Sequence, residues 1–245
     1  MIVIDLFYHT TPNARKVLMM LEEVGAPYRI VWTDISKGDQ FKPEYLAINP
    51  NGKVPAILDH DGPDGEPIRV FESGAILLYL AEKFGKLLPQ DQADKYHCLA
   101  WVCWQVSGQG PMSGQGAHFV SHAPKAGIDI PYARERYERE VRRHYDVLEH
   151  ALSARQWLVG DSFTIADLAA FPWTRVSKGH GVDLADYPAV KAWSDRIAER
   201  PSAKVRPEDA RGIERGQGYQ GYDPDQWKTL FGAGQTRLGE RSSSN

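Results

Sequence analysis

Residues 70–80, Val-Phe-Glu-Ser-Gly-Ala-Ile-Leu-Leu-Tyr-Leu, join the end of an apolar strand to the start of an apolar helix. The first backbone N–H groups of a helix have no partner within it and carry partial positive charge, so this junction can bind a carboxylate or a phosphate. Glu72 beside it offers an acceptor for an ammonium group. A ligand with both groups on one carbon would satisfy both preferences. The alternative is an ordinary helix cap, in which Glu72 or Ser73 stabilises only its own first turn.

The sequence before this junction predicts an α/β domain. Residues 2–7 are rich in β-branched and aromatic side chains, which indicates a short buried strand, and residues 28–32 indicate a second strand. Between them, apolar residues recur at helical spacing from Asn13 until Gly25 ends the helix. A strand, a helix and a strand in this order form a β-α-β unit, so we expect the two strands to be parallel.

Residues 49–58, Asn-Pro-Asn-Gly-Lys-Val-Pro-Ala-Ile-Leu, combine a turn with the beginning of a third strand. A turn rich in Gly, Pro and Asp at residues 61–67 leads to an antiparallel fourth strand at 68–71 and a closing helix at 73–84. With a short helical segment before residue 49, the predicted order is β-α-β-α-β-β-α. This order, with Pro55 directly before the third strand, resembles the thioredoxin-like fold. The resemblance implies that this proline is cis.

The rest of the chain predicts helices alone, after a Pro-containing linker at residues 86–92. The helical domain is expected to span residues 93–201. Within it, residues 107–127 are rich in Gly, Ser, Pro and His, and we expect them to be irregular. Thr164 and Asp167 match a capping box that starts a buried helix.

Residues 202–245 are predicted to be an extension that is at most partly ordered. Their composition is polar and rich in Gly, Gln, Arg and Ser, which favours disorder at residues 237–245. Five apolar side chains can still attach part of the extension to the rest of the protein: Tyr219, Tyr222, Trp227, Leu230 and Phe231.

Composition and charge exclude several classes of function. The chain has 245 residues, of which 42% are hydrophobic and 25% charged, as in an ordinary globular protein. A formal net charge of -3 gives no electrostatic reason to bind nucleic acid or an anionic membrane. No apolar run approaches the roughly 18 residues of a membrane span, and no signal peptide is recognisable at the N-terminus. We therefore expect a cytoplasmic protein.

The two cysteines predict neither a metal site nor a redox pair. Cys98 and Cys103 match no known metal or dithiol spacing. Five residues correspond to about 500° of helical rotation, so the two side chains point to different faces of a helix. We expect both to be small core hydrophobes.

An α/β thioredoxin-like domain at residues 1–85 followed by an all-helical domain resembles the cytosolic glutathione transferases, over about residues 1–201. Three motifs carry this resemblance: Asn-Pro-Asn-Gly-Lys-Val-Pro-Ala from residue 49, Phe-Glu-Ser-Gly-Ala-Ile-Leu-Leu-Tyr-Leu-Ala-Glu-Lys from residue 71, and the Phe-Thr-Ile-Ala-Asp capping box from residue 163. Thr11-Pro12-Asn13, Lys37-Gly38-Asp39-Gln40-Phe41 and the stretch from Trp104 to Met112 are similar to the nu class. That class comprises bacterial disulfide-bond oxidoreductases related to the transferase-like domain of the yeast Ure2 protein.

The resemblance implies that the first domain binds glutathione, with separate residues for its γ-glutamyl end and for its cysteinyl backbone. Glu72 and Ser73 would bind the ammonium and carboxylate of the γ-glutamyl end. The main chain of Val54, ahead of Pro55, would pair with the cysteinyl backbone as a short added strand.

The same resemblance assigns three further residues to the carboxylates of glutathione. Lys53 and Gln40 stand at the positions that bind the glycine carboxylate, although exposed Lys and Gln side chains are common. Arg136 matches an arginine of the nu class that faces the active site and binds a second glutathione. A solvated charge on a helix face is an equally good interpretation of Arg136.

Thr11 and Asn13 are predicted to surround the glutathione sulfur. The resemblance implies that a threonine hydroxyl and an asparagine amide at the start of the first helix lower the pKa of the thiol, together with the positive helix end. An ordinary cap, with Thr11 at the N-cap and Pro12 at the first helical position, is compatible with this role. Tyr8 and Thr10 are rival hydroxyls.

The resemblance implies a homodimeric, glutathione-dependent enzyme that reduces small or mixed disulfides without a redox cysteine of its own. Glutathione is then a co-substrate, and small thiols and disulfides are the partners. Two alternatives stay open. The chain can be a transferase or peroxidase that acts on electrophiles or hydroperoxides, or a non-catalytic glutathione-binding regulator.

Overall fold

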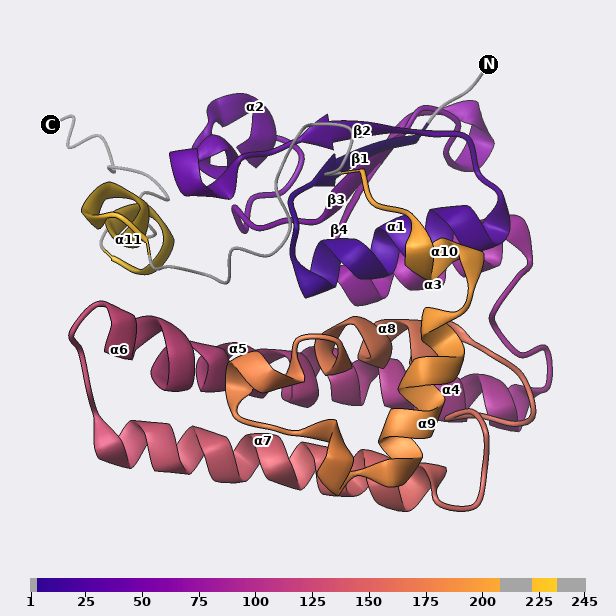
Figure 1. The fold of residues 1–245 in the computed structure, drawn as a ribbon. Coiled ribbons are helices and arrows are strands. Elements are labelled where there is room, and N and C mark those ends of the chain that lie inside the picture. Colours follow the sequence, from indigo (N-terminus) through magenta and orange to yellow (C-terminus); the bar gives the residue numbers. More distant parts are fainter. Residues whose placement is uncertain (1–3, 208–221, 233–245) are drawn as a thin grey trace, which may run out of the picture.

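The computed structural model describes residues 4–207 and 222–232 (Figure 1). The first domain contains a four-stranded sheet in the order β2-β1-β3-β4. β1 pairs in parallel with β2 and antiparallel with β3, which pairs antiparallel with β4. The strands are β1 (Ile4–Tyr8), β2 (Tyr28–Trp32), β3 (Ala56–Asp59) and β4 (Ile68–Phe71). This topology confirms the predicted thioredoxin-like fold.

Two long helices of the first domain lie between its sheet and the second domain. α1 (Pro12–Val24) and α3 (Ser73–Phe84) lie between the sheet and the helical domain in Figure 1, whereas the short α2 (Pro43–Leu46) lies away from it. α1 begins as predicted, because the Thr11 hydroxyl accepts the Ala14 N–H at 3.1 Å and Pro12 occupies the first turn. It ends at Gly25, which has a φ of 73°.

The second domain consists of helices in the part of the chain that the structure describes. They are α4 (Gln92–Trp104), α5 (Gly110–Ala117), α6 (Ala123–Lys125), α7 (Pro131–Leu152), α8 (Ile165–Thr174), α9 (Pro188–Ala198) and α10 (Pro201–Lys204). α1 packs against α8 and α10, and the Arg200 guanidinium pairs with the Glu23 carboxylate across the domains at 2.7 Å. None of the described helices is both long and apolar enough to cross a membrane.

The prediction that residues 107–127 are irregular is wrong. This segment is helical, with π-helical turns η4 (Gln105–Gln109) and η5 (His118–His122) on either side of α5. Its glycines are needed for close packing rather than for a loop. A Cβ on Gly108 would lie 2.7 Å from His144 Nε2, and one on Gly116 would lie 2.8 Å from Val141 Cγ2. Residues 107–127 therefore have a loop-like composition because their helices pack closely against α7.

The cysteine prediction is correct only in part. Cys98 is buried in the core as expected, but Cys103 is exposed on α4. The difference follows from their spacing, because the opposite face of α4 meets solvent.

Part of the C-terminal extension folds as a helix. Tyr222 and the residues of α11 (Pro224–Phe231) pack onto the protein, as the apolar side chains of this segment predicted. Tyr219 and residues 237–245 lie outside the described residues.

Asp167 organises the start of α8. Its carboxylate accepts the backbone N–H of Thr164 at 3.0 Å and forms the predicted capping box. It also accepts the Leu158 N–H at 2.9 Å and the Trp193 indole N–H at 2.8 Å, so one fully buried side chain joins three segments of the helical domain.

We expect Asp167→Ala to lower the free energy of unfolding by at least about 3 kcal/mol in urea titrations. Three buried N–H donors would lose their acceptor, and each such loss costs about 1–3 kcal/mol. The control is Asp183→Ala, which removes an exposed cap on the Ala185 N–H and should cost no more than about 1 kcal/mol. Equal losses in the two variants would contradict this role of Asp167.

Candidate active site

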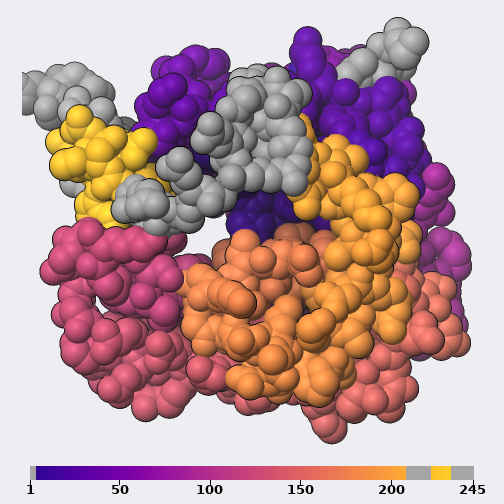
Figure 2. Space-filling model, in the orientation of Figure 1, coloured from indigo at the N-terminus to yellow at the C-terminus, as the bar shows by residue number. Residues whose placement is uncertain are grey.

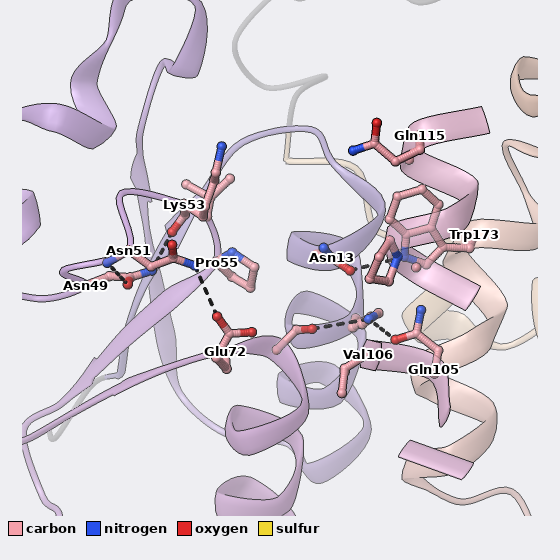
Figure 3. A pocket seen from close by; sticks show the side chains of 16 residues that line it. Asn13, Asn49, Asn51, Lys53, Pro55, Glu72, Gln105, Val106, Gln115 and Trp173 are labelled. Atoms are coloured by element: carbon pink, nitrogen blue, oxygen red, sulfur yellow. Dashed lines mark hydrogen bonds between the residues drawn. The ribbon is translucent and has the colours of Figure 1, made fainter. Parts of the chain in front are cut away.

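Two adjoining cavities lie between the domains and form one cleft. The first, of about 330 Å³, is lined by Glu72 and Ser73 at one end. The second, of about 570 Å³, is lined by Thr11 and by residues of α11. Both are lined by Asn13 at the start of α1, by Lys53 and Val54 before β3, and by Gly114, Gln115 and Trp173 of the helical domain, so they adjoin along these residues. Figure 3 shows the N-terminal domain contributing Glu72 and Lys53 from one side, with Gln115 and Trp173 facing them.

Glu72 and Ser73 form the charged end of the first cavity. Glu72 occupies the N-cap position of α3, but its side chain makes no capping hydrogen bond. Its carboxylate instead accepts the Asn51 side-chain amide at 3.3 Å. Glu72 has a φ of 68°, a conformation that costs about 1–3 kcal/mol in a non-glycine residue and is concentrated at functional sites. The structure therefore excludes the ordinary cap as the role of the Glu72 side chain.

The loop before β3 presents the main chain of Val54 to the cavity. Two side chains hold the carbonyl oxygen of Lys53: the Tyr45 hydroxyl donates to it at 2.5 Å and the Asn49 amide at 2.7 Å. The Val54–Pro55 peptide bond is cis, as the resemblance implied. Val54 and Pro55 both line the first cavity.

Asn13 is oriented by the other domain. The Trp173 indole N–H donates to Asn13 Oδ1 at 3.1 Å. Because an indole nitrogen can only donate, the amide oxygen must face Trp173 and the NH₂ group must point away from it. Figure 3 shows the Asn13 nitrogen directed away from Trp173. The N-terminus of α1 thus offers an amide donor beside its own positive end.

The candidate hydroxyls are separated by the structure. Thr11 lines the second cavity, and its oxygen accepts from Ala14, which leaves its hydrogen available to donate. Tyr8 ends β1 and is buried, and Thr10 is exposed; neither lines the two cavities. The geometry favours Thr11 over both.

Three residues were assigned to the carboxylates of glutathione: Lys53, Gln40 and Arg136. Lys53 and Gln40 both line the second cavity. Gln40 is buried, and its amide donates to the Ile35 carbonyl at 3.1 Å, with one N–H left to donate elsewhere. Arg136 is exposed on α7 and lines neither cavity.

Sequence reasoning missed three residues of the site: Lys16, Gln105 and Trp173. Lys16 Nζ donates to Ser73 Oγ at 3.2 Å and also to Gln105 Oε1. The spacing of three residues from Asn13 places Lys16 on the same face of α1 and was an available signal. Gln105 and Trp173 come from the helical domain, and no local pattern indicates their contacts.

Lys16 is a buried lysine without an ion-pair partner among residues 4–207 and 222–232. Its side chain is only 1% exposed. Burial lowers the pKa of Lys16 to about 7, although the nearby Glu72 carboxylate acts in the opposite direction. The charged end of the cleft thus contains a lysine whose charge is costly until an anion approaches.

We expect the native protein to gain stability from Lys16 as the pH rises. Between about pH 7 and the ordinary lysine pKa of 10.5, the unfolded chain binds a proton at Lys16 that the native protein does not bind. The free energy of unfolding of the wild type, minus that of Lys16→Met, should therefore increase by about 1.4 kcal/mol per pH unit in this range.

Urea titrations between pH 7 and 10 measure this difference. Lys178→Met, on an exposed lysine, is the matched control and should follow the wild-type pH dependence. Parallel profiles for the wild type and Lys16→Met would show that Lys16 keeps its ordinary pKa.

Comparison with known proteins identifies the family. Family models of the glutathione S-transferase N-terminal and C-terminal domains match residues 10–83 and 119–201. The chain is 49% identical to the disulfide-bond oxidoreductase YfcG of Escherichia coli over 201 residues, which cover 82% of this chain and 92% of YfcG. It is 37% identical to the transcriptional regulator URE2 of Saccharomyces cerevisiae, over 80% of this chain and 65% of URE2.

Solved structures agree with this result. A glutathione transferase family member from Pseudomonas fluorescens, crystallised with two glutathione bound, matches with a TM-score of 0.78 and 40% identity, over 86% of this chain and 92% of that one. A glutathione transferase from Pseudomonas putida, with one glutathione disulfide bound per subunit, matches with a TM-score of 0.78 and 39% identity, over 86% and 91% of the two chains. The chain belongs to the glutathione S-transferase family.

Proposed function

We propose that this protein is a glutathione-dependent disulfide-bond oxidoreductase. The observation that carries the proposal is the order of groups along the cleft. The charged end at Glu72 and Ser73 is followed by the Val54 main chain, and the Asn13 amide lies where the two cavities meet. Glutathione bound in the first cavity would place its thiol at Asn13, facing the second cavity.

The relatives support this assignment. YfcG and YghU of Escherichia coli, 49% and 41% identical to this chain, are both named disulfide-bond oxidoreductases. The related transferase from Pseudomonas putida holds a glutathione disulfide, and the one from Pseudomonas fluorescens holds two glutathione molecules. A cleft of this kind can therefore hold both partners of a thiol–disulfide exchange.

The chemistry requires a thiolate, which the start of α1 would stabilise. The Asn13 NH₂, the Thr11 hydroxyl and the positive helix end favour the anionic sulfur. The thiolate attacks a disulfide, one S–S bond forms as another breaks, and the displaced thiolate takes a proton from solvent. A second glutathione thiolate then releases the other product and leaves glutathione disulfide.

The cysteines of the chain take no part in this scheme. Neither lines the two cavities, and burial raises the pKa of the Cys98 thiol. Both reacting sulfurs therefore come from bound molecules. Catalysis then consists of thiolate stabilisation and orientation.

The ends of glutathione are held by charges and donors of the first domain. Ser73, backed by Lys16, would bind the γ-glutamyl carboxylate, and Glu72 the ammonium group. Lys53, which lines both cavities, and Gln40, which lines only the second, would bind the glycine carboxylate, so the glycyl end of glutathione would extend into the second cavity. Arg136 stays a prediction for a second glutathione and has no role in this scheme. The homodimer stays a prediction from the resemblance, and the cytoplasmic location stays a prediction from the sequence.

Two other functions use the same site. The apolar wall of the second cavity, which includes Trp173 and Phe231, suits an electrophile and supports transferase activity as a second candidate. Yeast URE2 is named a transcriptional regulator, and a regulatory protein without catalytic activity would bind glutathione without turnover. Parallel assays with a model disulfide, an aryl halide and cumene hydroperoxide rank these functions.

We expect Asn13→Ala to lower kcat/KM for a model disulfide by about 10- to 100-fold, because a hydrogen bond to a charged group is worth about 1.5–3 kcal/mol. Steady-state assays with 2-hydroxyethyl disulfide and glutathione measure this effect. Asn51→Ala, which removes a partner of Glu72 at the other end of the cavity, should act mainly on the KM for glutathione. Full activity of Asn13→Ala would remove Asn13 from the mechanism.

We expect Trp173→Phe to raise the pKa of the bound glutathione thiol by about one unit. Without the indole donor the Asn13 amide can rotate, and one neutral hydrogen bond is worth about 1 kcal/mol. Thiolate absorbance in the ultraviolet, titrated against pH, gives this pKa. Trp157→Phe, in a tryptophan that packs on Phe163 and Arg196 outside both cavities, is the control. An unchanged thiol pKa in Trp173→Phe would contradict the orienting role.

A further inference from the structure

Lys16 lies in the interior of the protein and still reaches the charged end of the first cavity. Its helix, α1, packs against α3, α8 and α10. Figure 2 shows the orange surface of α9 and α10 directly against the indigo surface of the first domain. The Lys16 side chain is 1% exposed, yet it lines the cavity together with Glu72 and Ser73. A ligand in this cavity would therefore meet Lys16 Nζ away from bulk water.

The hydrogen bonds of Lys16 leave a donor for a ligand only if the amine is protonated. Nζ donates to Ser73 Oγ at 3.2 Å and to Gln105 Oε1. A neutral amine has two N–H groups, which these two acceptors occupy, and its lone pair would face a bound anion. The ammonium form has a third N–H, which is available to an anion in the cavity. An anionic ligand therefore selects the protonated form of Lys16.

The surroundings of Lys16 favour the neutral amine while no anion is bound. Burial lowers the pKa of Lys16 to about 7, and the nearby Glu72 carboxylate opposes this effect only in part. The other charged side chains on the elements that pack against α1 have partners elsewhere: Asp5 pairs with Arg29, Glu82 with Lys95, Lys83 with Asp59 and Lys204 with Glu199, and Asp167 accepts from the helical domain. Tyr8 and Tyr79, on the same elements, carry no charge near neutral pH.

A carboxylate bound at Ser73 would reverse this preference. The Ser73 oxygen accepts from Lys16, so the Ser73 hydroxyl hydrogen is left to donate to the ligand. The same carboxylate would lie next to Lys16 Nζ, where an opposite charge favours the ammonium form and raises the pKa of the amine. Between the pKa of the free protein and that of the complex, binding therefore takes up a proton.

We propose that Lys16 selects the γ-glutamyl α-carboxylate of glutathione and takes up one proton when this carboxylate binds. This inference rests on the proposed function and specifies how the same site recognises its ligand. In the complex the carboxylate accepts from the Lys16 ammonium and from the Ser73 hydroxyl. A ligand that has the amine but lacks the α-carboxylate gains neither contact and leaves Lys16 neutral.

The proton taken up by Lys16 balances the one that the glutathione thiol gives up. Formation of the thiolate beside Asn13 releases a proton to solvent, and Lys16 takes one from solvent. The cleft thus gains a positive charge as the ligand gains a negative one. Near pH 8, glutathione should bind with almost no net exchange of protons. A thioether of glutathione, whose sulfur cannot ionise, should show the uptake at Lys16 alone.

The test compares S-methylglutathione with an analogue in which 4-aminobutanoyl replaces the γ-glutamyl group. The analogue keeps the amine and loses only the α-carboxylate. Both ligands keep the glycine carboxylate, so any protonation of Lys53 contributes equally to both. The ratio of the two Kd values, in favour of S-methylglutathione, should fall about tenfold between pH 7 and 8.5, because Lys16 becomes neutral in the free protein.

Two variants assign this pH dependence. In Lys16→Met the ratio of the two Kd values should be smaller at pH 7 and should not change up to pH 8.5. Lys178→Met, on an exposed lysine, should keep the wild-type ratio and its pH dependence. A ratio that falls equally in the wild type and in Lys16→Met would overturn the assignment to Lys16.

Calorimetry of the wild type counts the protons without any variant. Titrations at pH 8 in buffers of different ionisation enthalpy give the uptake per bound ligand. We expect S-methylglutathione to take up close to one proton more than the 4-aminobutanoyl analogue. Equal uptake for the two ligands would overturn the inference.

These binding experiments separate the inference from the proposed function. The extra proton uptake in a protein that turns over no disulfide would support the role of Lys16 and contradict only the oxidoreductase activity. Turnover of 2-hydroxyethyl disulfide without the extra uptake would overturn only the role of Lys16. Failure of S-methylglutathione to bind would overturn both.

Discussion

The hydrogen bond from the Trp173 indole to the Asn13 amide is the contact on which the candidate mechanism depends. It joins residues 160 positions apart in the sequence and in different domains. Since the donor can satisfy only the amide oxygen, this bond decides which end of Asn13 faces the cleft. The groups proposed to bind the peptide part of glutathione all come from the thioredoxin-like domain, but the amide proposed to bind its thiol is oriented by the helical domain.

A second link between the domains is formed by Lys16, and it affects the charge of the cleft rather than the orientation of a side chain. Lys16 of α1 donates to Ser73 at the start of α3 and to Gln105 of the helical domain. It has no carboxylate partner among the described residues, so its charge is available to a bound anion. Glu72 keeps its carboxylate at the surface of the same cavity. The site is therefore complementary to a ligand with adjacent positive and negative groups.

The sequence predicted most of the first domain because its signals are local. The alternation of strands and helices, the cap at Thr11 and the motif around Pro55 all lie within a few residues of the elements they determine. Residues 107–127 were misread, because the glycines that pack against His144 and Val141 have the composition of a loop. The contacts of Trp173 and Gln105, and the position of α11, depend on tertiary packing and have no local signature.

A crystal structure with bound glutathione disulfide tests the central claim most directly. The account predicts one glutathionyl half in the first cavity, with its γ-glutamyl carboxylate at Ser73, its ammonium at Glu72 and its sulfur within about 3.5 Å of the Asn13 amide nitrogen. A ligand bound in the reverse direction, or with its sulfur remote from the start of α1, would contradict it.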